Sequence, residues 1–136
     1  MKIMIVEDDV PSRDLLQLFL ADFGQCDLAS NGRQALEAVE QAMAAGDPYD
    51  LICMDIMMPE MDGMEALRAI RRLEIKHFLK ESDSVKIIMV TAKGQAGDVM
   101  NAFDSGCEAY IIKPVSKEKL YTQLEELGLI AQPDSV

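Results

Sequence analysis

Short apolar runs alternate with longer segments of helical periodicity along most of the chain, and this alternation limits the fold more than any other feature. Four runs are nearly continuous, as buried strands are: Ile3 to Val6, Leu51 to Met54, Val85 to Val90 and Ala109 to Ile112. A weaker fifth run covers Cys26 to Ala29. This order predicts an α/β domain with a parallel sheet covered by helices on both faces, because right-handed crossovers lay each helix back across the sheet.

Each segment that follows a run carries an apolar face, and most begin with a residue suited to start a helix. Pro11 suits the first turn of the first helix, and Asn31, Asp62 and Ser116 can cap the second, third and fifth. The expected apolar faces are, in chain order, Leu15, Leu16, Phe19, Leu20 and Phe23; Ala35, Leu36, Val39 and Met43; Leu67 and Ile70; Val99, Met100 and Phe103; and Leu120, Leu124 and Leu127.

The length and composition of the chain fit one globular domain. The chain has 136 residues, of which 49% are hydrophobic and 27% are charged. We expect a domain over residues 1–128 and a short tail over residues 129–136.

Charge and cysteine usage narrow the class of protein further. A formal net charge of -11 argues against direct nucleic-acid binding, which depends on Lys and Arg neutralising phosphates. No stretch is long enough to cross a bilayer or to form the apolar core of a leader peptide. The three cysteines, Cys26, Cys53 and Cys107, lack the spacing of a zinc site or a disulfide framework, so we expect free thiols in a cytoplasmic protein.

Acidic, hydroxyl and cationic side chains stand where the predicted strands end. Glu7 and Asp8 follow the first strand, Asp55 the third, Thr91 the fourth and Lys113 the fifth, so a parallel sheet gathers them at one edge. Carboxylates about 5 Å apart repel by roughly 3 kcal/mol at an effective dielectric near 20, and a hard cation such as Mg²⁺ would relieve that. With a Lys and a Thr to contact phosphoryl oxygens, the set suits an aspartyl phosphate.

Asp9 and Asp62 follow strands as well, but we assign them to turns or helix caps, the commonest role of such residues. Lys113 before Pro114 is the most telling member of the set, because a lysine at a buried strand end needs a partner.

The ordered motifs resemble the receiver domain of bacterial two-component response regulators, from Lys2 to about Leu127. They are Ile5-Val6-Glu7-Asp8-Asp9, Met54-Asp55-Ile56-Met57-Met58-Pro59, Asp62-Gly63, Val90-Thr91-Ala92, and Gly106 through Tyr110 to Lys113-Pro114. The resemblance implies a flavodoxin-like (CheY-like), doubly wound sheet of five parallel strands in the order 2-1-3-4-5, with five helices.

The resemblance also implies roles for individual residues. Asp55 would accept a phosphoryl group from the phosphohistidine of a sensor histidine kinase or a histidine phosphotransfer protein. Asp8 and Asp55 would hold Mg²⁺ together with the backbone carbonyl of Met57, and Glu7 would act through bound water. Thr91 and Lys113 would contact the phosphoryl oxygens.

The resemblance further implies that Thr91 and Tyr110 form a switch. Thr91 would move toward the phosphate and Tyr110 would turn inward, which would reshape the face made by the fourth helix, the fifth strand and the fifth helix. It implies a cis Lys113-Pro114 bond. Met57 and Lys93 occupy the positions that tune phosphoryl lifetime, and a thioether cannot orient an attacking water as an amide can. We therefore expect the phosphoryl group to persist for minutes or longer. We expect the chain to be a phosphoacceptor signalling protein and not an enzyme.

Three other functions fit the residues of this chain less well. A Mg²⁺-dependent phosphatase of the haloacid dehalogenase family places a second Asp two residues after its nucleophile, where this chain has Met57. A flavodoxin-like electron carrier needs a Ser, Thr and Gly-rich phosphate loop, and Glu7-Asp8-Asp9 would repel the flavin phosphate. A phosphorylation-independent interaction module is disfavoured because no member of the acidic, Thr and Lys set is missing.

Two further features have a simpler interpretation. His77, the only histidine, lies in a charged helical stretch and is expected to be solvated. The stretch from Leu73 to Lys80 is a few residues longer than the usual receiver pattern, which predicts a longer third helix or an insertion. Met54 is expected to pack in the core, whereas the roles of the loop methionines stay open.

Overall fold

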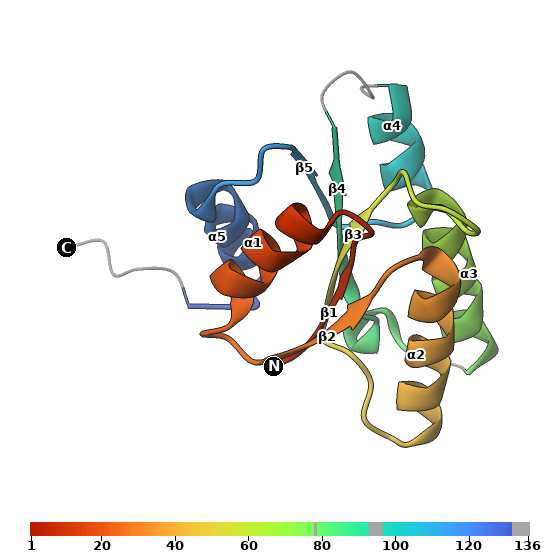
Figure 1. Cartoon of the computed structure of the whole chain (residues 1–136). Helices are drawn as coiled ribbons and strands as arrows, with labels where there is room; N and C mark the ends of the chain where they lie inside the picture. Colours follow the sequence, from red (N-terminus) through yellow and green to blue (C-terminus); the bar gives the residue numbers. More distant parts are fainter. Residues whose placement is uncertain (78, 93–96, 132–136) are drawn as a thin grey trace.

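The computed structural model describes residues 1–77, 79–92 and 97–131, and it shows a twisted parallel sheet between two layers of helices (Figure 1). The strands are β1 (Lys2–Val6), β2 (Gln25–Ala29), β3 (Leu51–Asp55), β4 (Lys86–Thr91) and β5 (Ala109–Ile112). The helices are α1 (Val10–Leu20), α2 (Gly32–Ala44), α3 (Gly63–Lys76), α4 (Gly97–Asp104) and α5 (Lys117–Glu126), with a short 3-10 helix at Glu81–Asp83.

The strand order is β2-β1-β3-β4-β5, and every neighbouring pair is parallel. The predicted doubly wound fold is therefore confirmed, including its strand order and, within the described ranges, its five helices. The strand order reverses between β1 and β3, which is where open α/β sheets place their functional crevice.

Two buried apolar clusters, one on each face of the sheet, hold the layers together. Alternate residues of β3 face opposite sides: Ile52 and Met54 join the cluster under α2 and α3, whereas Leu51 and Cys53 join the cluster under α1 and α5. Figure 1 shows the same division, with α1 and α5 on one side of the sheet and α2 and α3 on the other. Each buried aliphatic side chain contributes roughly 1.5–3 kcal/mol, so these two clusters dominate the stability.

Four helices begin at the side-chain caps that the sequence suggests. Asp9, Asn31, Asp62 and Ser116 each accept a hydrogen bond from a backbone N–H three residues later. This satisfies one of the free donors at the helix start and stabilises the helix by about 1 kcal/mol. Asp9 and Asp62 are therefore caps, as predicted.

Among the side chains that the structure describes, the predicted apolar faces are confirmed in their centres and wrong at two margins. The side chains of Val99 and Met100 lie outside the described ones. Leu16 and Leu20 of α1 and Leu120 and Leu124 of α5 are fully buried. Leu15 is 37% exposed and Phe103 is 45% exposed. A helix on the outside of a single sheet buries only the stripe that faces the strands, so apolar residues at the edge of that stripe stay in contact with water.

The last residues of α3, up to Lys76, and the 3-10 helix Glu81–Asp83 lead from α3 to β4. His77 caps the carboxyl end of α3 and is exposed, as expected for a solvated histidine.

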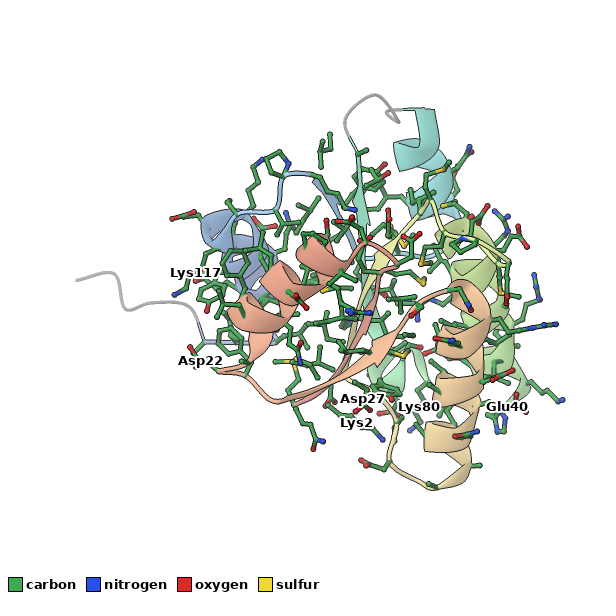
Figure 2. All side chains as sticks on the ribbon, in the orientation of Figure 1. Lys2, Asp22, Asp27, Glu40, Lys80 and Lys117 are labelled. Atoms are coloured by element: carbon green, nitrogen blue, oxygen red, sulfur yellow. The ribbon has the colours of Figure 1, made fainter. Side chains whose placement is uncertain are left out.

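Figure 2 shows charged side chains such as Asp22, Glu40 and Lys117 on the outer surface, and Lys2 near Asp27 beside the starts of the strands. There Tyr49 Oη donates to Asp27 Oδ2 at 2.6 Å and Lys2 Nζ pairs with Asp47 Oδ2 at 3.2 Å.

All three cysteines are free thiols, as predicted, and burial raises the pKa of Cys53 to about 12. Among the described residues, no helix combines the length and apolar character that a membrane span requires. The division at residue 128 stays a prediction, although Leu129 and Ile130 pack partly against the cluster under α1 and α5.

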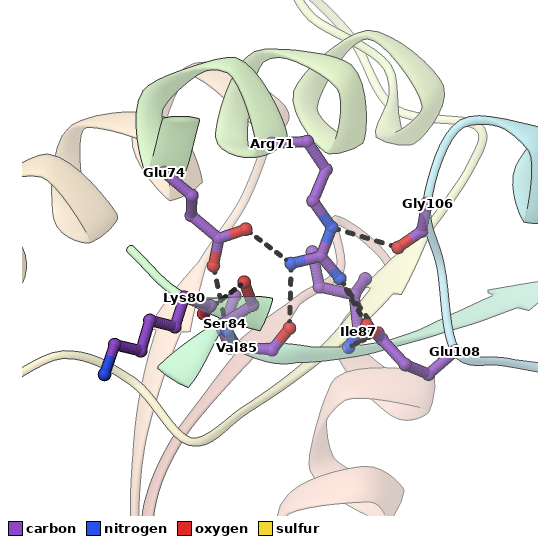
Figure 3. A network of polar contacts seen from close by, with 8 residues as sticks. All are labelled: Arg71, Glu74, Lys80, Ser84, Val85, Ile87, Gly106 and Glu108. Atoms are coloured by element: carbon purple, nitrogen blue, oxygen red, sulfur yellow. Dashed lines mark hydrogen bonds and ion pairs between the residues drawn. The ribbon is translucent and has the colours of Figure 1, made fainter. Parts of the chain in front are cut away.

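The amino end of β4 is held by one arginine from α3, and this arrangement was not predicted. Arg71 Nε donates to the Gly106 carbonyl at 2.9 Å, and Nη1 donates to Glu74 Oε1 at 2.7 Å and to the Val85 carbonyl at 2.9 Å (Figure 3). Its Nη2 binds both carboxylate oxygens of Glu108 at 2.8 and 2.9 Å. The whole guanidinium fork is therefore engaged.

The two carboxylates of this arginine network in turn cover the free edge of β4. Glu74 Oε2 accepts from the Val85 N–H at 2.9 Å, and Glu108 Oε2 accepts from the Ile87 N–H at 2.6 Å. Pairing with β5 begins only at Ile88, so these side chains replace ladder bonds that β5 does not provide. Gly106 has a φ of +108°, and an added Cβ would lie 3.1 Å from the Arg71 side chain, so glycine suits both the backbone and the close contact.

Candidate functional site

The predicted site residues lie at the carboxyl edge of the sheet, because each follows or ends a parallel strand. Glu7 and Asp8 follow β1, Asp55 ends β3, Thr91 ends β4, and Lys113 follows β5. The register places Asp55 beside Val90, so Thr91 lies one residue further along the neighbouring strand.

Three carboxylates form the centre of this edge. One oxygen each from Glu7, Asp8 and Asp55 lies within 4.8 Å of the others. Glu7 is fully buried and Asp55 is 6% exposed, whereas Asp8 faces solvent. Three oxygen ligands this close, with one side open to water, suit a hard divalent cation that keeps part of its hydration shell.

Lys113 provides the positive charge of the site. Its Nζ lies 3.0 Å from Glu7 Oε2 and 3.4 Å from Asp55 Oδ2. Burial works against the ammonium charge, but the contact with the Glu7 carboxylate and the charge of Asp55 outweigh it and raise the pKa of Lys113. The lysine therefore stays protonated beside Asp55. The bond from Lys113 to Pro114 is cis, as the resemblance implied.

Glu7 is the residue on which the electrostatic cost of this edge falls. Burial first, and then the charge of Asp55, raise the pKa of Glu7 to about 7, although Lys113 opposes the shift. Its Oε2 pairs with Lys113 by charge but makes no well-aligned hydrogen bond. A cation held among the three carboxylates would compensate this buried charge, so the residues present fit Mg²⁺.

Thr91 and Tyr110, the two predicted switch residues, lie on adjacent strands. Thr91 is fully buried, and its Oγ1 has no hydrogen-bond partner among the described residues. A buried hydroxyl without a partner costs about 1–3 kcal/mol, which points to a partner that is supplied in another state of the site. Tyr110 is half-buried on β5, next to Met89 of β4.

Comparison with known proteins supports the same assignment: residues 3–125 match the response regulator receiver domain. The chain belongs to that family. The receiver domain is 35% identical over 127 residues to the transcriptional regulatory protein ResD of Bacillus subtilis, covering 93% of this chain and 47% of ResD. It is also 35% identical over 125 residues to the histidine-protein kinase BarA of Escherichia coli, covering 91% of this chain and 12% of BarA.

Solved structures give the same result. The receiver domain of the Pseudomonas aeruginosa sensor histidine kinase PA1611, crystallised with magnesium in its active-site cleft, is 29% identical, with a TM-score of 0.73 and coverage of 92% of this chain and 94% of that one. A chain from the co-crystal of yeast Ypd1, a histidine phosphotransfer protein, with the receiver domain of Ssk1 is 28% identical, with a TM-score of 0.79 and coverage of 99% and 93%.

The receiver domain spans less than half the length of these curated relatives, which are a transcriptional regulator and a kinase. That it acts as a single-domain protein stays a prediction. The two-component signalling class is shown by the family match.

Met57 lies in the loop after β3, and its side chain is 60% exposed. The loop closes on the start of α3, where the Gly63 N–H donates to the Ile56 carbonyl at 2.8 Å. A Cβ at Gly63 would collide with the Asp55 carbonyl, so glycine is needed for this close approach. Lys93, the other predicted lifetime residue, lies outside the described residues.

A groove beside the candidate site was not predicted from the sequence. It has a volume of about 420 Å³ and shares Lys113 with the site. Its lining residues are Pro11, Ser12, Leu15, Leu16, Ala92, Lys113, Pro114 and Val115. On the same helix, Val10 is 51% exposed and Leu18 is 69% exposed. The available signal was the presence of apolar residues around more of α1 than one buried stripe requires.

Proposed function

We propose that this receiver domain accepts a phosphoryl group on Asp55 from a phosphohistidine of a kinase or a phosphotransfer protein. The observation that supports it most is a nearly buried Asp55 carboxylate 3.4 Å from the Lys113 ammonium, inside a cluster of three carboxylates. In the transfer, an Asp55 oxygen attacks phosphorus, a P–O bond forms, and the P–N bond to the histidine breaks with its electron pair returning to the imidazole.

The chain's own residues orient this reaction. Asp8 and Asp55 are the proposed direct ligands of Mg²⁺, with the Met57 carbonyl as a third and Glu7 acting through water. When bound, the ion offsets the negative charge of the carboxylates and of the phosphoryl oxygens. Lys113 is held ready to exchange its carboxylate contacts for a phosphoryl oxygen.

The proposed output is a change at the face of α4, β5 and α5. The free hydroxyl of Thr91 gains an acceptor when Asp55 carries a phosphoryl group, and Tyr110 turns inward as Thr91 moves. Phe103 of α4 and Ile112 of β5 are exposed, and a groove of about 500 Å³ is lined by Tyr110, Ile112 and residues of α5. A downstream protein that binds there would distinguish the two states.

We place the incoming donor over the groove of α1. That groove is apolar, opens next to Lys113, and lies beside the exposed Val10 and Leu18. Ypd1, which is crystallised with a similar receiver domain, is a donor of the expected kind. The free thiols agree with the predicted cytoplasmic setting.

The direct test is to incubate the protein with acetyl phosphate and Mg²⁺ and to follow the intact mass. We expect a gain of one phosphoryl group that requires Mg²⁺ and that Asp55→Asn does not show. A gain of the same size in the Asp55→Asn variant, or none in the unmodified chain, would reject the phosphoacceptor function and favour a phosphorylation-independent interaction module.

A further inference from the structure

We infer that Met57 is an oxidation site through which peroxides shorten the lifetime of the phosphoryl group on Asp55. The inference rests on the proposed function of Asp55 and adds a second chemical input to the same site. It is carried by the exposure of the Met57 side chain and by its place in the chain.

Met57 lies close to Asp55 because only two peptide units separate them. β3 ends at Asp55, and Met57 is the second residue of the loop that follows. Two peptide units span at most about 7 Å between Cα atoms. The Met57 side chain is therefore a near neighbour of the phosphoacceptor and is in contact with water.

Exposure makes Met57 the preferred target of a soluble oxidant. Its side chain is 60% exposed, whereas Met54 and Met89 are fully buried and Met64 is 7% exposed. Among the methionines whose side chains the structure describes, the others are buried or half-buried. Oxidation follows access to the sulfur, so a low dose of peroxide modifies Met57 first.

The chemistry converts an inert side chain into a hydrogen-bond acceptor. Hydrogen peroxide transfers one oxygen to the Met57 sulfur: the O–O bond breaks, an S–O bond forms, sulfur loses two electrons, and the peroxide is reduced to water. A thioether is a weak acceptor, whereas the sulfoxide oxygen is a strong one. It can hold a water molecule beside the acyl phosphate for attack on phosphorus.

We expect oxidation to shorten the phosphoryl lifetime about two- to tenfold, the range that one net hydrogen bond to the attacking water provides. The fold requires no change, because the side chain is in solvent and makes no contact in either apolar cluster.

The experiment phosphorylates the protein with acetyl phosphate and Mg²⁺, removes the donor, and follows loss of the phosphoryl mass with and without a low dose of hydrogen peroxide. Peptide mass mapping then locates the added oxygen. We expect it at Met57, together with the shorter lifetime. Met57→Leu should give the same lifetime before and after peroxide, and Met57→Gln, which places an amide oxygen there, should have a shorter lifetime than Met57→Leu without any oxidant.

Met61→Leu is the matched control, because Met61 lies in the same loop but is half-buried. It should keep the full response to peroxide. Oxygen added first at another methionine, an unchanged lifetime after oxidation of Met57, or an equal response in Met57→Leu would each overturn the inference while leaving Asp55 as the phosphoacceptor. Failure of the unmodified chain to gain any phosphoryl group would instead remove the proposed function, and this inference with it.

Discussion

The two ends of the sheet carry similar charged groups but use them in opposite ways. At the amino end of β4, Arg71 lies between two carboxylates, and each donor nitrogen of its guanidinium has a hydrogen bond (Figure 3). At the carboxyl edge, Lys113 also lies between two carboxylates, but the Thr91 hydroxyl at the same edge has no hydrogen-bond partner among the described residues.

The difference separates groups that hold the fold from groups that are available for chemistry. A polar network whose groups are fully paired gains nothing from a ligand, so the arginine network can only stabilise. The carboxyl edge keeps unbalanced negative charge and an unpaired hydroxyl. A bound cation can offset this charge, and a phosphoryl group can accept a hydrogen bond from this hydroxyl. Four substitutions or conditions test this contrast, in order of decreasing effect.

Lys113→Met removes the cation at the carboxyl edge. Because Lys113 is the proposed donor to the phosphoryl oxygens, the initial rate of Asp55 phosphorylation by acetyl phosphate should fall about 10²–10³-fold. Intact mass against time measures the rate. Lys76→Met, which removes an exposed lysine at the end of α3, serves as the control and should keep the rate. Equal rates in both variants would contradict a role for Lys113 in the transfer.

Arg71→Met removes the cation at the amino end. It leaves Glu74 and Glu108 without their partner, and the free energy of unfolding should fall by roughly 3 kcal/mol. The next residue supplies the control: Arg72 is exposed, and Arg72→Met should change stability by less than about 0.5 kcal/mol. Urea unfolding curves give both values. A loss in Arg72→Met as large as in Arg71→Met would show that the network itself contributes nothing.

The pKa of Glu7 predicts how the metal-free protein responds to pH. In the folded protein this pKa is about 7, raised from the ordinary value of 4.5, so the unfolded chain releases its proton at lower pH than the folded one. Stability is therefore highest at the acidic side and falls as pH rises from about 4.5 to about 7, by at most about 3 kcal/mol.

Urea unfolding in a chelator at several pH values measures this slope. Glu7→Gln should flatten it over the same interval, because the amide does not titrate. Addition of Mg²⁺ should restore stability most at the higher pH, where Glu7 is charged. A slope that is unchanged in Glu7→Gln would assign the pH dependence to other groups.

Thr91→Val gives the smallest expected change in stability. The substitution replaces a buried hydroxyl that has no partner by a methyl group of similar size, so the free energy of unfolding should rise by about 1 kcal/mol. The same variant should still take up a phosphoryl group but respond less at Tyr110, which tyrosine fluorescence or NMR can follow. A loss of stability instead would show that the hydroxyl has a partner in the resting protein.

The outcome of the sequence predictions follows the same contrast between the two ends. The carboxyl edge was predicted because Glu7, Asp55, Thr91 and Lys113 all occupy one kind of position, the end of a strand, and parallel strands end together. Arg71 carries no such mark: it lies in a helix rich in charged residues and would ordinarily be assigned to solvent. Glu108 stands 37 residues away from it in the chain.

What the sequence determined by itself was local or repetitive. Strand runs and the helix caps at Asn31, Asp62 and Ser116 depend on a few neighbouring residues, so their physical causes are visible in the chain. The gathering of functional groups followed from the repeated strand-helix order, because that order fixes a parallel sheet. The resemblance to receiver domains added the strand order and the role of each site residue.

The tertiary structure alone decided which charges meet and which side chains face water. That Lys113 lies between Glu7 and Asp55, that Leu15 lines a groove instead of the core, and that Met57 is exposed while Met54 is buried all depend on how the layers pack. Burial and distance set pKa values and access, and both arise from residues that are far apart in the chain.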